Sequence, residues 1–391
     1  GWRAWRGGRV AMACLLLTLA GTASERVRAQ SAIDGFTPPI TGGVVRALDV
    51  TGGKILVGGE FTMAGATRKV ARLHPDGTRD TGFGLGFAPP TGAVSVVRSF
   101  VRNFNTSYLV GGDFAGVGYP SHLARLFDDG VLMTSFNLNL NGAVRAIEFG
   151  PTGGMYIGGE FTAVNGVARH RVARLTEELT LDPTFTPPLF NGTITAVRPL
   201  SNGKVLVGGF LLGIPGNTGA GWALFRLNAN GSLDTGFVFD STPQGLDQVQ
   251  AIEVQTDGKI LIAGDFIATQ GGQTRRRVAR LNTNGSLDLS YTPPTLDGAV
   301  VRMELQSDGR AVIAGAFTGV GLANRIARLN HDGSVDGGFA PLLNPDNFVS
   351  ALALQGDGGV LFGGAFAEVT GVTANRVARI EIGRASCRER V

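Results

Sequence analysis

Cysteine is almost missing from this sequence. The 391 residues contain two cysteines, Cys14 and Cys387, and both lie near the ends of the chain. The long central part, residues 30–380, therefore has neither a disulfide bond nor a thiol nucleophile. Its stability has to come from packing.

Lysine is scarce in the central part, and its charge is balanced. The whole chain has 35 Lys and Arg against 31 Asp and Glu, but the basic excess comes from the two ends. Residues 30–380 hold 27 basic and 28 acidic residues, with no basic stripe and no cluster of interleaved aromatic and basic residues. Nucleic-acid binding is therefore not expected. No window of this part has a convincing helical period, which favours strands.

The first 29 residues have the pattern of a secretory signal peptide. Three arginines precede the apolar run 11–21, which is too short to span a bilayer, and small residues follow. We expect cleavage after Ala23 or Ala29, and a secreted or cell-surface protein whose mature chain has no membrane span.

The other end, residues 381–391, breaks every pattern that precedes it. It resembles the translation of a sequencing adapter, and a short basic tail is the alternative. The predicted organisation is thus a signal peptide at 1–29, one repetitive domain at 30–380, and a tail at 381–391.

A repeat of about 50 residues runs through the central part. Its first landmark is a motif such as VGGEF or IAGDF, and its second is an arginine in an apolar run further on. The last position of the motif falls at Phe61, Phe114, Phe161, Leu211, Phe266, Phe317 and Phe366, spaced 47 to 55 residues apart. The arginines are Arg72, Arg125, Arg174, Arg226, Arg280, Arg328 and Arg379. Seven units of this length are typical of propeller blades.

Each unit is predicted to contain four short strands. In the fifth unit these are 249–255, 259–266, 277–282 and 286–291, separated by turn sequences such as TDG and NG. The small residues of the second strand indicate that a neighbouring backbone comes close. Four-stranded antiparallel meanders placed side by side form a β-propeller, and a right-handed β-helix is the second choice.

The stretch SAIDGFTPP at 31–39 resembles the end of a unit, although it lies before the first one. Aromatic residues mark the fourth strand in six units, and the seventh unit has none of its own. We expect Phe36 to supply it, with 31–39 pairing with the third strand of the last unit. The ring would then be closed by an N-terminal strand that covers its free edges.

The combination DGKILIAGDF and RRVARLNTNGSLDLSY within 257–291 is similar to the delta-60 repeat β-propellers of secreted bacterial proteins. The resemblance covers about 31–380. It implies the propeller fold and export, and it suggests a module of a larger surface protein. Because that family is largely uncharacterised, it implies no activity.

Catalytic and metal-binding signatures are weak. His74, His122, His170 and His331 occupy different positions of the repeat, and no carboxylate accompanies them at a ligand-like spacing. The motif NHDGSVD at 330–336 is interpreted as a hairpin turn rather than a calcium loop. We predict no catalytic, metal-binding or cofactor-binding residue.

The repeated arginine could form an anion-binding ring, but a structural role is favoured. An acid precedes it in only four units (Glu60, Asp113, Glu160, Asp265), so the arginine does not depend on that partner. We expect it to bind strand-end carbonyls or a neighbouring blade.

A partner surface is predicted where the units differ most. The connections between motif and arginine are longest in the fourth and fifth units. They carry Ile214 and Trp222 in one, and Arg275, Arg276 and Arg277 in the other, which are residue types that dominate interface energies. The alternative is that the lengths of these loops vary without any function, with Trp222 packed inward and the arginines solvated.

The function predicted from the sequence is a monomeric, exported propeller that acts as a binding module for a protein or glycan. The alternative is a propeller enzyme, a glycan lyase or hydrolase, with its site in the central funnel. Converging acids and histidines that do not repeat would favour the enzyme, whereas small and apolar repeated residues would favour the scaffold.

Overall fold

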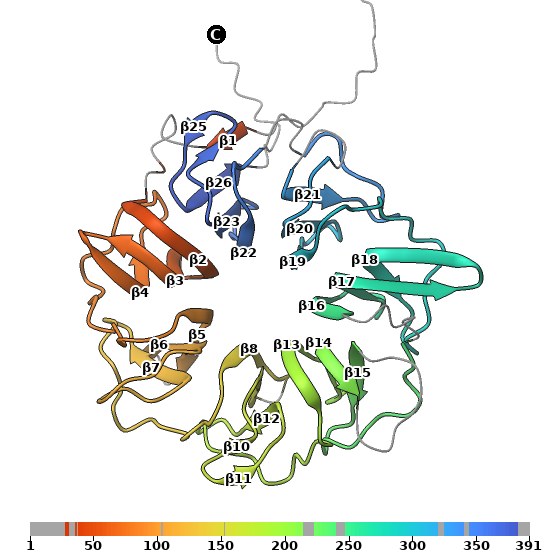
Figure 1. The fold of residues 1–391 in the computed structure, drawn as a ribbon, viewed down its shortest axis with the longest axis horizontal. Coiled ribbons are helices and arrows are strands. Elements are labelled where there is room, and N and C mark those ends of the chain that lie inside the picture. The colour runs from red at the N-terminus through yellow and green to blue at the C-terminus, as the bar shows by residue number, and fades with distance from the viewer. Residues whose placement is uncertain are drawn as a thin grey trace, which may run out of the picture.

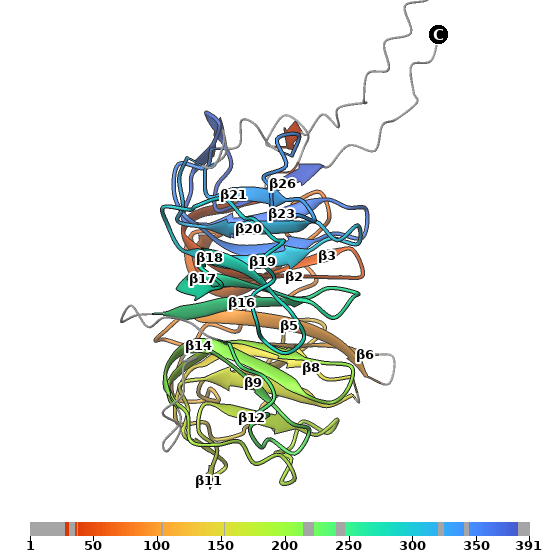
Figure 2. The same ribbon diagram turned by 90° about the vertical axis from the view of Figure 1, so that its right-hand side faces the viewer.

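The fold is seen in a computed structural model that describes residues 28–30, 36, 38–102, 105–151, 153–213, 223–239, 247–319, 324–339 and 344–381. Every regular element among them is a β-strand. Antiparallel sheets stand side by side around a common centre (Figure 1), and Figure 2 shows the same ring from its edge. The predicted all-β fold is confirmed.

Each repeat unit forms a meander of three main strands. The inner strands, which face the centre in Figure 1, are β2 (Ile40–Thr51), β5 (Val94–Arg102), β8 (Val144–Phe149), β13 (Asn191–Pro199), β16 (Gln248–Val254), β19 (Val300–Leu305) and β22 (Val349–Leu354). The middle strands are β3 (Lys54–Met63), β6 (Asn105–Gly112), β9 (Met155–Gly159), β14 (Val205–Gly213), β17 (Ile260–Gln270), β20 (Ala311–Gly315) and β23 (Val360–Gly364). The third strands are β4 (Ala66–Leu73), β7 (Leu123–Phe127), β12 (Val172–Leu175), β15 (Leu224–Leu227), β18 (Gln273–Leu281), β21 (Ile326–Leu329) and β26 (Val377–Glu381). Two small hairpins, β10 (Ala163–Val164) with β11 (Val167–Ala168) and β24 (Glu368–Val369) with β25 (Val372–Thr373), extend two of the units.

The glycine pairs of the repeated motif have two separate roles. A Cβ on the second glycine would meet the inner strand of the same sheet, because a register shift bends that strand inward: at Gly264 it would lie 1.9 Å from the Gln248 carbonyl oxygen. A Cβ on the first glycine would meet the next unit, as at Gly58, 2.7 Å from Val94. The predicted close approach is therefore confirmed.

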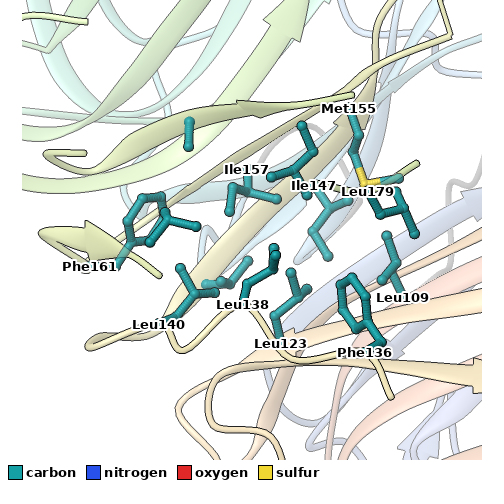
Figure 3. Close-up of a cluster of buried hydrophobic side chains, with 14 of the residues drawn as sticks. Leu109, Leu123, Phe136, Leu138, Leu140, Ile147, Met155, Ile157, Phe161 and Leu179 are labelled. Carbon is teal, nitrogen blue, oxygen red and sulfur yellow. The ribbon is translucent and has the colours of Figure 1, made fainter. Parts of the chain in front are cut away.

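Apolar side chains fill the space between neighbouring units. The middle strands are buried along their length, as in β9, β20 and β23. Figure 3 shows one such layer, where Leu109, Leu123 and Phe136 of the second unit pack with Ile157 and Phe161 of the third. Because each sheet is covered on both faces, its strands are continuously apolar rather than alternating.

In the first six units the predicted fourth strand is reduced to a single bridge. Leu287 pairs with Leu281 of β18, and the corresponding bridges in other units include Leu175 with Leu181 and Leu227 with Leu233. The aromatic residue that marks this segment is buried in every unit (Phe83, Phe136, Phe185, Phe237, Tyr291, Phe339). The segment is therefore held by its aromatic anchor more than by a strand ladder.

The first and last units are in contact. Gly363 of the last unit packs on Val45 of the first, and the Ser350 hydroxyl donates a hydrogen bond to the Val45 carbonyl at 2.6 Å. Phe36 is 4% exposed and belongs to a cluster that draws on both units. Phe36 is therefore buried between the first and last units.

The predicted pairing of 31–39 with the last unit is wrong in its register. The strand that pairs with β26 is β1 (Arg28–Gln30), with Ala29 opposite Ile380, while residues 31–35 and 37 lie outside the described residues. Phe36 follows Ala29 by seven positions, whereas the aromatic residue of the fifth unit follows its bridging Leu287 by four. This different spacing made the repeat a poor guide to the register. The strands β1 and β26 also overlap the ends predicted as signal peptide and tail.

Candidate functional site

The centre of the ring is a narrow channel lined by the inner strands. Its wall includes Ala47, Ala146, Ala196 and Ala251, which occupy matching positions of four inner strands. The cavity has a volume of about 90 Å³, enough for roughly six water molecules. Sites for small-molecule ligands usually have ~300 Å³ or more, so the channel itself is too small for such a ligand.

Two positions after these alanines, the inner strands carry charges whose sign alternates through the first five units. The residues in chain order are Asp49, Arg98, Glu148, Arg198, Glu253, Glu304 and Ala353. Arg98 pairs with Glu148 and Arg198 pairs with Glu253, so each ion pair joins two neighbouring units. Asp49 accepts a hydrogen bond from the Ser99 backbone N–H at 2.8 Å. Most of the channel charge is thus neutralised by the protein itself.

Glu304 and Arg302 depart from this pattern. Burial raises the pKa of Glu304, which has no hydrogen bond or ion pair among the described residues, although Arg98 and Arg198 oppose the shift. Burial lowers the pKa of Arg302 to about 10, and repulsion by Arg98 adds to the effect. Arg302 occupies a position that is alanine in most units, and its guanidinium donates to the Arg46 carbonyl at 3.3 Å.

A second hollow lies at the mouth of the channel, beside the first, sixth and seventh units. It has a volume of about 300 Å³, and its wall includes Arg46, Arg302, Ser350 and Phe348. Phe348 is 37% exposed. Arg145 of the third unit donates to Ser95, which also lines the hollow, at 2.8 Å, and its charge is bound by Glu160 at 2.9 Å.

The histidines and acids do not assemble into a metal centre. Among the described residues, no three His, Cys, Asp or Glu side chains are grouped as metal ligands. His74 lies 2.8 Å from Lys54 Nζ, and His331 Nε2 lies 2.6 Å from the Asp308 carbonyl oxygen, both in surface turns. The motif at 330–336 is a hairpin, in which Asp332 accepts hydrogen bonds from Ser334.

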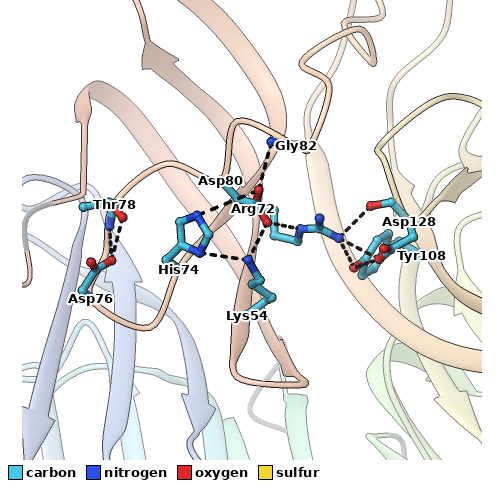
Figure 4. Close-up of polar contacts among 9 residues, drawn as sticks. All are labelled: Lys54, Arg72, His74, Asp76, Thr78, Asp80, Gly82, Tyr108 and Asp128. Carbon is cyan, nitrogen blue, oxygen red and sulfur yellow. Dashed lines mark hydrogen bonds and ion pairs between the residues drawn. The ribbon is translucent and has the colours of Figure 1, made fainter.

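The repeated arginine joins neighbouring units, as predicted. In the first unit the guanidinium of Arg72 donates to the Asp128 carbonyl of the second unit at 2.6 Å (Figure 4). It also stacks 5.1 Å above the Phe83 ring. Arg174 and Arg280 reach the next unit's Ala229 and His331 carbonyls in the same way, each at 2.6 Å. The structural interpretation is confirmed.

The acid that neutralises this arginine was missed in the sequence. It lies eight positions further on, in the turn before the fourth segment, and it binds the arginine Nε at 2.6 to 2.9 Å. The five acids are Asp80, Asp182, Asp234, Asp288 and Asp336. Three of them also bind a lysine from the start of the middle strand, as Asp80 binds Lys54 at 2.9 Å. The repeated Asp in sequences such as GSLD was the available signal.

The residues predicted to bind a partner fall into two groups. Ile214 and Trp222 lie outside the described residues. Arg275 donates to the carbonyls of Tyr291 and Leu289, and Arg277 donates to the Leu296 carbonyl at 2.6 Å and lies 3.2 Å from Asp265. Arg276 is exposed and has no hydrogen bond or ion pair among the described residues, so its charge is available at the surface.

Arg277 also belongs to a repeated structural position. It has a positive φ of 65°, and the equivalent residues Arg171, Arg325 and Arg376 share that conformation. Each of these arginines donates to a backbone carbonyl. Arg171 and Arg376 bind one just after their own middle strand, whereas Arg277 and Arg325 bind one in the segment that leads to the next unit. The recurrence of arginine directly before the third strand was visible in the sequence.

Several segments of the chain match a known protein family. Residues 53–83, 150–185, 200–237, 255–291 and 306–339 match the family described as domain of unknown function (DUF5122) beta-propeller. Five segments of this chain thus match this β-propeller family. The predicted resemblance to repeat propellers of unknown function is confirmed, and a comparison with curated proteins gives no match.

Solved structures with a similar fold come from several kinds of protein. Virginiamycin B lyase from Staphylococcus aureus, solved with quinupristin, is 12% identical with a TM-score of 0.55. The match covers 92% of this chain and 99% of the lyase chain. The extracellular domain of a B. thetaiotaomicron protein described as a hybrid two-component system is 13% identical (TM-score 0.54; 94% of this chain, 45% of that one). PorZ, a surface component of the type-IX secretion system of Porphyromonas gingivalis, is 15% identical (TM-score 0.52; 88% and 48%). At these identities the likeness concerns the fold alone. Within the described residues no helix is long and apolar enough to cross a membrane.

Proposed function

We propose that this propeller is an exported binding module, a rigid scaffold that presents variable loops to a protein or glycan partner as part of a larger secreted or surface protein. The observation that carries this proposal is the channel, which is narrow and whose charges mostly pair with one another across neighbouring units. Such a channel strengthens the ring and leaves recognition to the outer surface. The extracellular and surface proteins among the structural neighbours support export.

The proposed architecture has seven blades, each of three strands and a fourth segment, closed into a ring by the N-terminal strand. The pairing of β1 with β26 and the contacts between the first and last units support this closure. Deleting residues 28–39 would expose an edge of the last sheet, and we expect the truncated protein to associate when measured by light scattering. A truncated protein that stays monomeric and melts like the intact one would contradict the closure.

The proposed partner surface is the face of the fourth and fifth units that carries Ile214, Trp222 and Arg275 to Arg277, with an acidic or glycan-bearing partner. Arg276 offers the accessible charge, because Arg275 and Arg277 are already bound to carbonyls. We would measure binding of chondroitin sulfate, polygalacturonate and neutral dextran to the immobilised protein.

Arg276→Ala should weaken binding of the anionic probes without changing the melting temperature, and Arg276→Lys should retain most of it. The double replacement of Arg275 and Arg276 with Ala should weaken binding further. Equal binding by the wild type and both alanine variants would overturn this choice of surface.

The alternative function, a glycan lyase or hydrolase, draws on Glu304 beside the mouth hollow. A carboxyl group with a raised pKa and no partner has the properties of a general acid. No second carboxyl or histidine without a partner joins it among the described channel residues, because the other acids there are bound. The binding module is therefore the better-supported function.

A further inference from the structure

The second unit lacks the acid that neutralises the repeated arginine in five other units. Met133 occupies the position of Asp80, Asp182 and Asp288, and its backbone N–H donates to the Arg125 carbonyl at 2.9 Å, as the N–H of Asp182 does to Arg174. The backbone is therefore the same, and only the carboxylate is missing. Ser107 stands where Lys54 and Lys259 stand in other units, so the cation that shares the acid is missing too.

Among the described residues, Arg125 also has no hydrogen bond to the next unit. In five other units the guanidinium donates to a turn carbonyl of the neighbouring unit, but here Arg102 donates to that carbonyl, of Glu177, at 2.7 Å. Arg125 keeps one hydrogen bond, to the Ser107 hydroxyl at 3.2 Å, and it lies 5.0 Å above the Phe100 ring. Its Nε is buried without an acceptor. Burial and then the charge of Arg102 lower the pKa of Arg125, as expected for a cation without an acid.

The Phe100 ring below Arg125 lines an apolar hollow between the second and third units, and several apolar side chains of these two units are exposed. Val101 is 65% exposed, Val131 54%, Phe127 44% and Phe149 39%. Phe100 and Phe149 face each other across the second and third units at 6.1 Å. Beside them lies a hollow of about 460 Å³, which is large enough for a side chain or short peptide segment. Its floor belongs to the apolar layer of Figure 3, near Met155 and Leu179.

We propose that this hollow between the second and third units, the Arg125 groove, binds a peptide segment in which an apolar side chain stands next to one acidic side chain. The apolar side chain would pack in the hollow against Phe100 and Phe149, and the carboxylate would bind Arg125 as an aspartate does in five other units of the same chain. The proposal rests on the proposed function, since it names one partner class for a binding module.

The surrounding charges select a single carboxylate rather than a polyanion. Arg102 is bound by Glu178 at 3.2 Å, and the Glu177 side chain lies against Gly153 on the far wall. These two acids would repel a ligand with many negative charges. The wall of the hollow has little hydrogen-bonding capacity outside Ser99 and the two charged residues, which favours a peptide over a sugar chain.

The test uses fluorescein-labelled peptides of one length and the full chain. The probe has the sequence Gly-Ser-Phe-Asp-Leu-Gly-Ser, and two controls carry Asn for Asp or Ala for Phe. We expect fluorescence polarisation to show binding of the probe, and at least tenfold weaker binding of both controls, because each loses one of the two contacts. Polyglutamate should not compete.

Two protein variants separate recognition from folding. Arg125→Gln removes the guanidinium and should weaken probe binding about tenfold or more. Met133→Asp restores the acid of the other units; it should raise the melting temperature and abolish binding, because Arg125 then has its partner within the chain. Arg46→Gln, an exposed arginine at the channel mouth and outside the groove, is the matched control and should bind the probe like the wild type.

A probe that binds Met133→Asp as well as the wild type, or a control peptide with Asn that binds equally, would overturn the Arg125 groove. Absence of probe binding would overturn it as well. If the polysaccharides used to test the proposed function bind in that case, only the groove fails; if nothing binds, both fail.

Discussion

Replacing Asp80 with Asn should destabilise the propeller strongly, although Asp80 is far from any proposed binding surface. Asp80 Oδ2 accepts from Arg72 Nε and from Lys54 Nζ, each at 2.9 Å, and the Asp80 and Arg72 side chains are 8% and 9% exposed. Removing the carboxylate takes away the negative charge that Arg72 and Lys54 both bind. A fully buried ion pair that loses one partner costs roughly 3–5 kcal/mol. Asp128 still binds Arg72, so we expect about 2–3 kcal/mol.

The pH dependence gives an independent value for the same interaction. Burial alone would raise the pKa of Asp80, but Lys54 and Arg72 outweigh it and lower the pKa from 3.8 to about 2. A carboxyl group with a lowered pKa stabilises the fold above its unfolded pKa and loses this contribution as the pH falls through the folded pKa. The shift corresponds to about 2 kcal/mol. The difference between wild type and variant should therefore shrink between about pH 4 and pH 2.

Urea unfolding followed by circular dichroism, over a series of pH values, measures both effects. The matched control is Asp76→Asn in the same turn, because Asp76 is exposed and, among the described residues, its carboxylate accepts side-chain and backbone hydrogen bonds from Thr78 alone. It should unfold with the wild type at every pH. The reasoning is refuted if Asp80→Asn and Asp76→Asn unfold at the same urea concentration.

Three further changes test the packing and the channel. Gly264→Ala places a Cβ 1.9 Å from the Gln248 carbonyl oxygen, so it should lower the melting temperature sharply. Gly356→Ala is the control and should not lower it, because no atom lies within 4 Å of the added Cβ. Similar melting temperatures for the two variants would disprove the role of the inner-strand bend. Phe36→Ala should cost about 3–5 kcal/mol in urea unfolding because the ring is buried, and a negligible loss would show that the N-terminal segment does not hold the ring. Glu304→Gln should raise stability at neutral pH and leave it unchanged in acid, because a carboxyl group with a raised pKa destabilises the fold only where it is ionised. A loss of stability at neutral pH would instead mean that the Glu304 carboxylate has a partner in the folded protein.

The sequence predicted the features that each unit repeats. The apolar strands, the glycine pairs, the buried aromatic residues and the inter-unit role of arginine recur in unit after unit, so a single physical cause could be inferred from many copies. Phe36 was assigned correctly by the same logic. Its register was not, because the spacing at the start of the chain differs from every other unit.

The features missed in the sequence involve residues from different units that meet in space. The pairs Arg98 with Glu148 and Arg198 with Glu253 lie about one repeat apart in the sequence, and no single unit shows them together. The Arg125 groove was missed for a related reason. Met133 alone gives no signal in the sequence. Its importance becomes clear only when the structure shows that the equivalent position in other units is an aspartate that binds the repeated arginine.

Whether this propeller binds its partners without altering them is tested most directly by the chemical fate of a bound probe. The full chain would be incubated with the polysaccharides and acidic peptides named above, and the bound and free fractions would be analysed by mass spectrometry. A binding module retains at least one probe and returns it with its mass unchanged. A probe that the wild type converts to a product of different mass, and that Glu304→Gln leaves intact, would contradict the binding module and establish an enzyme.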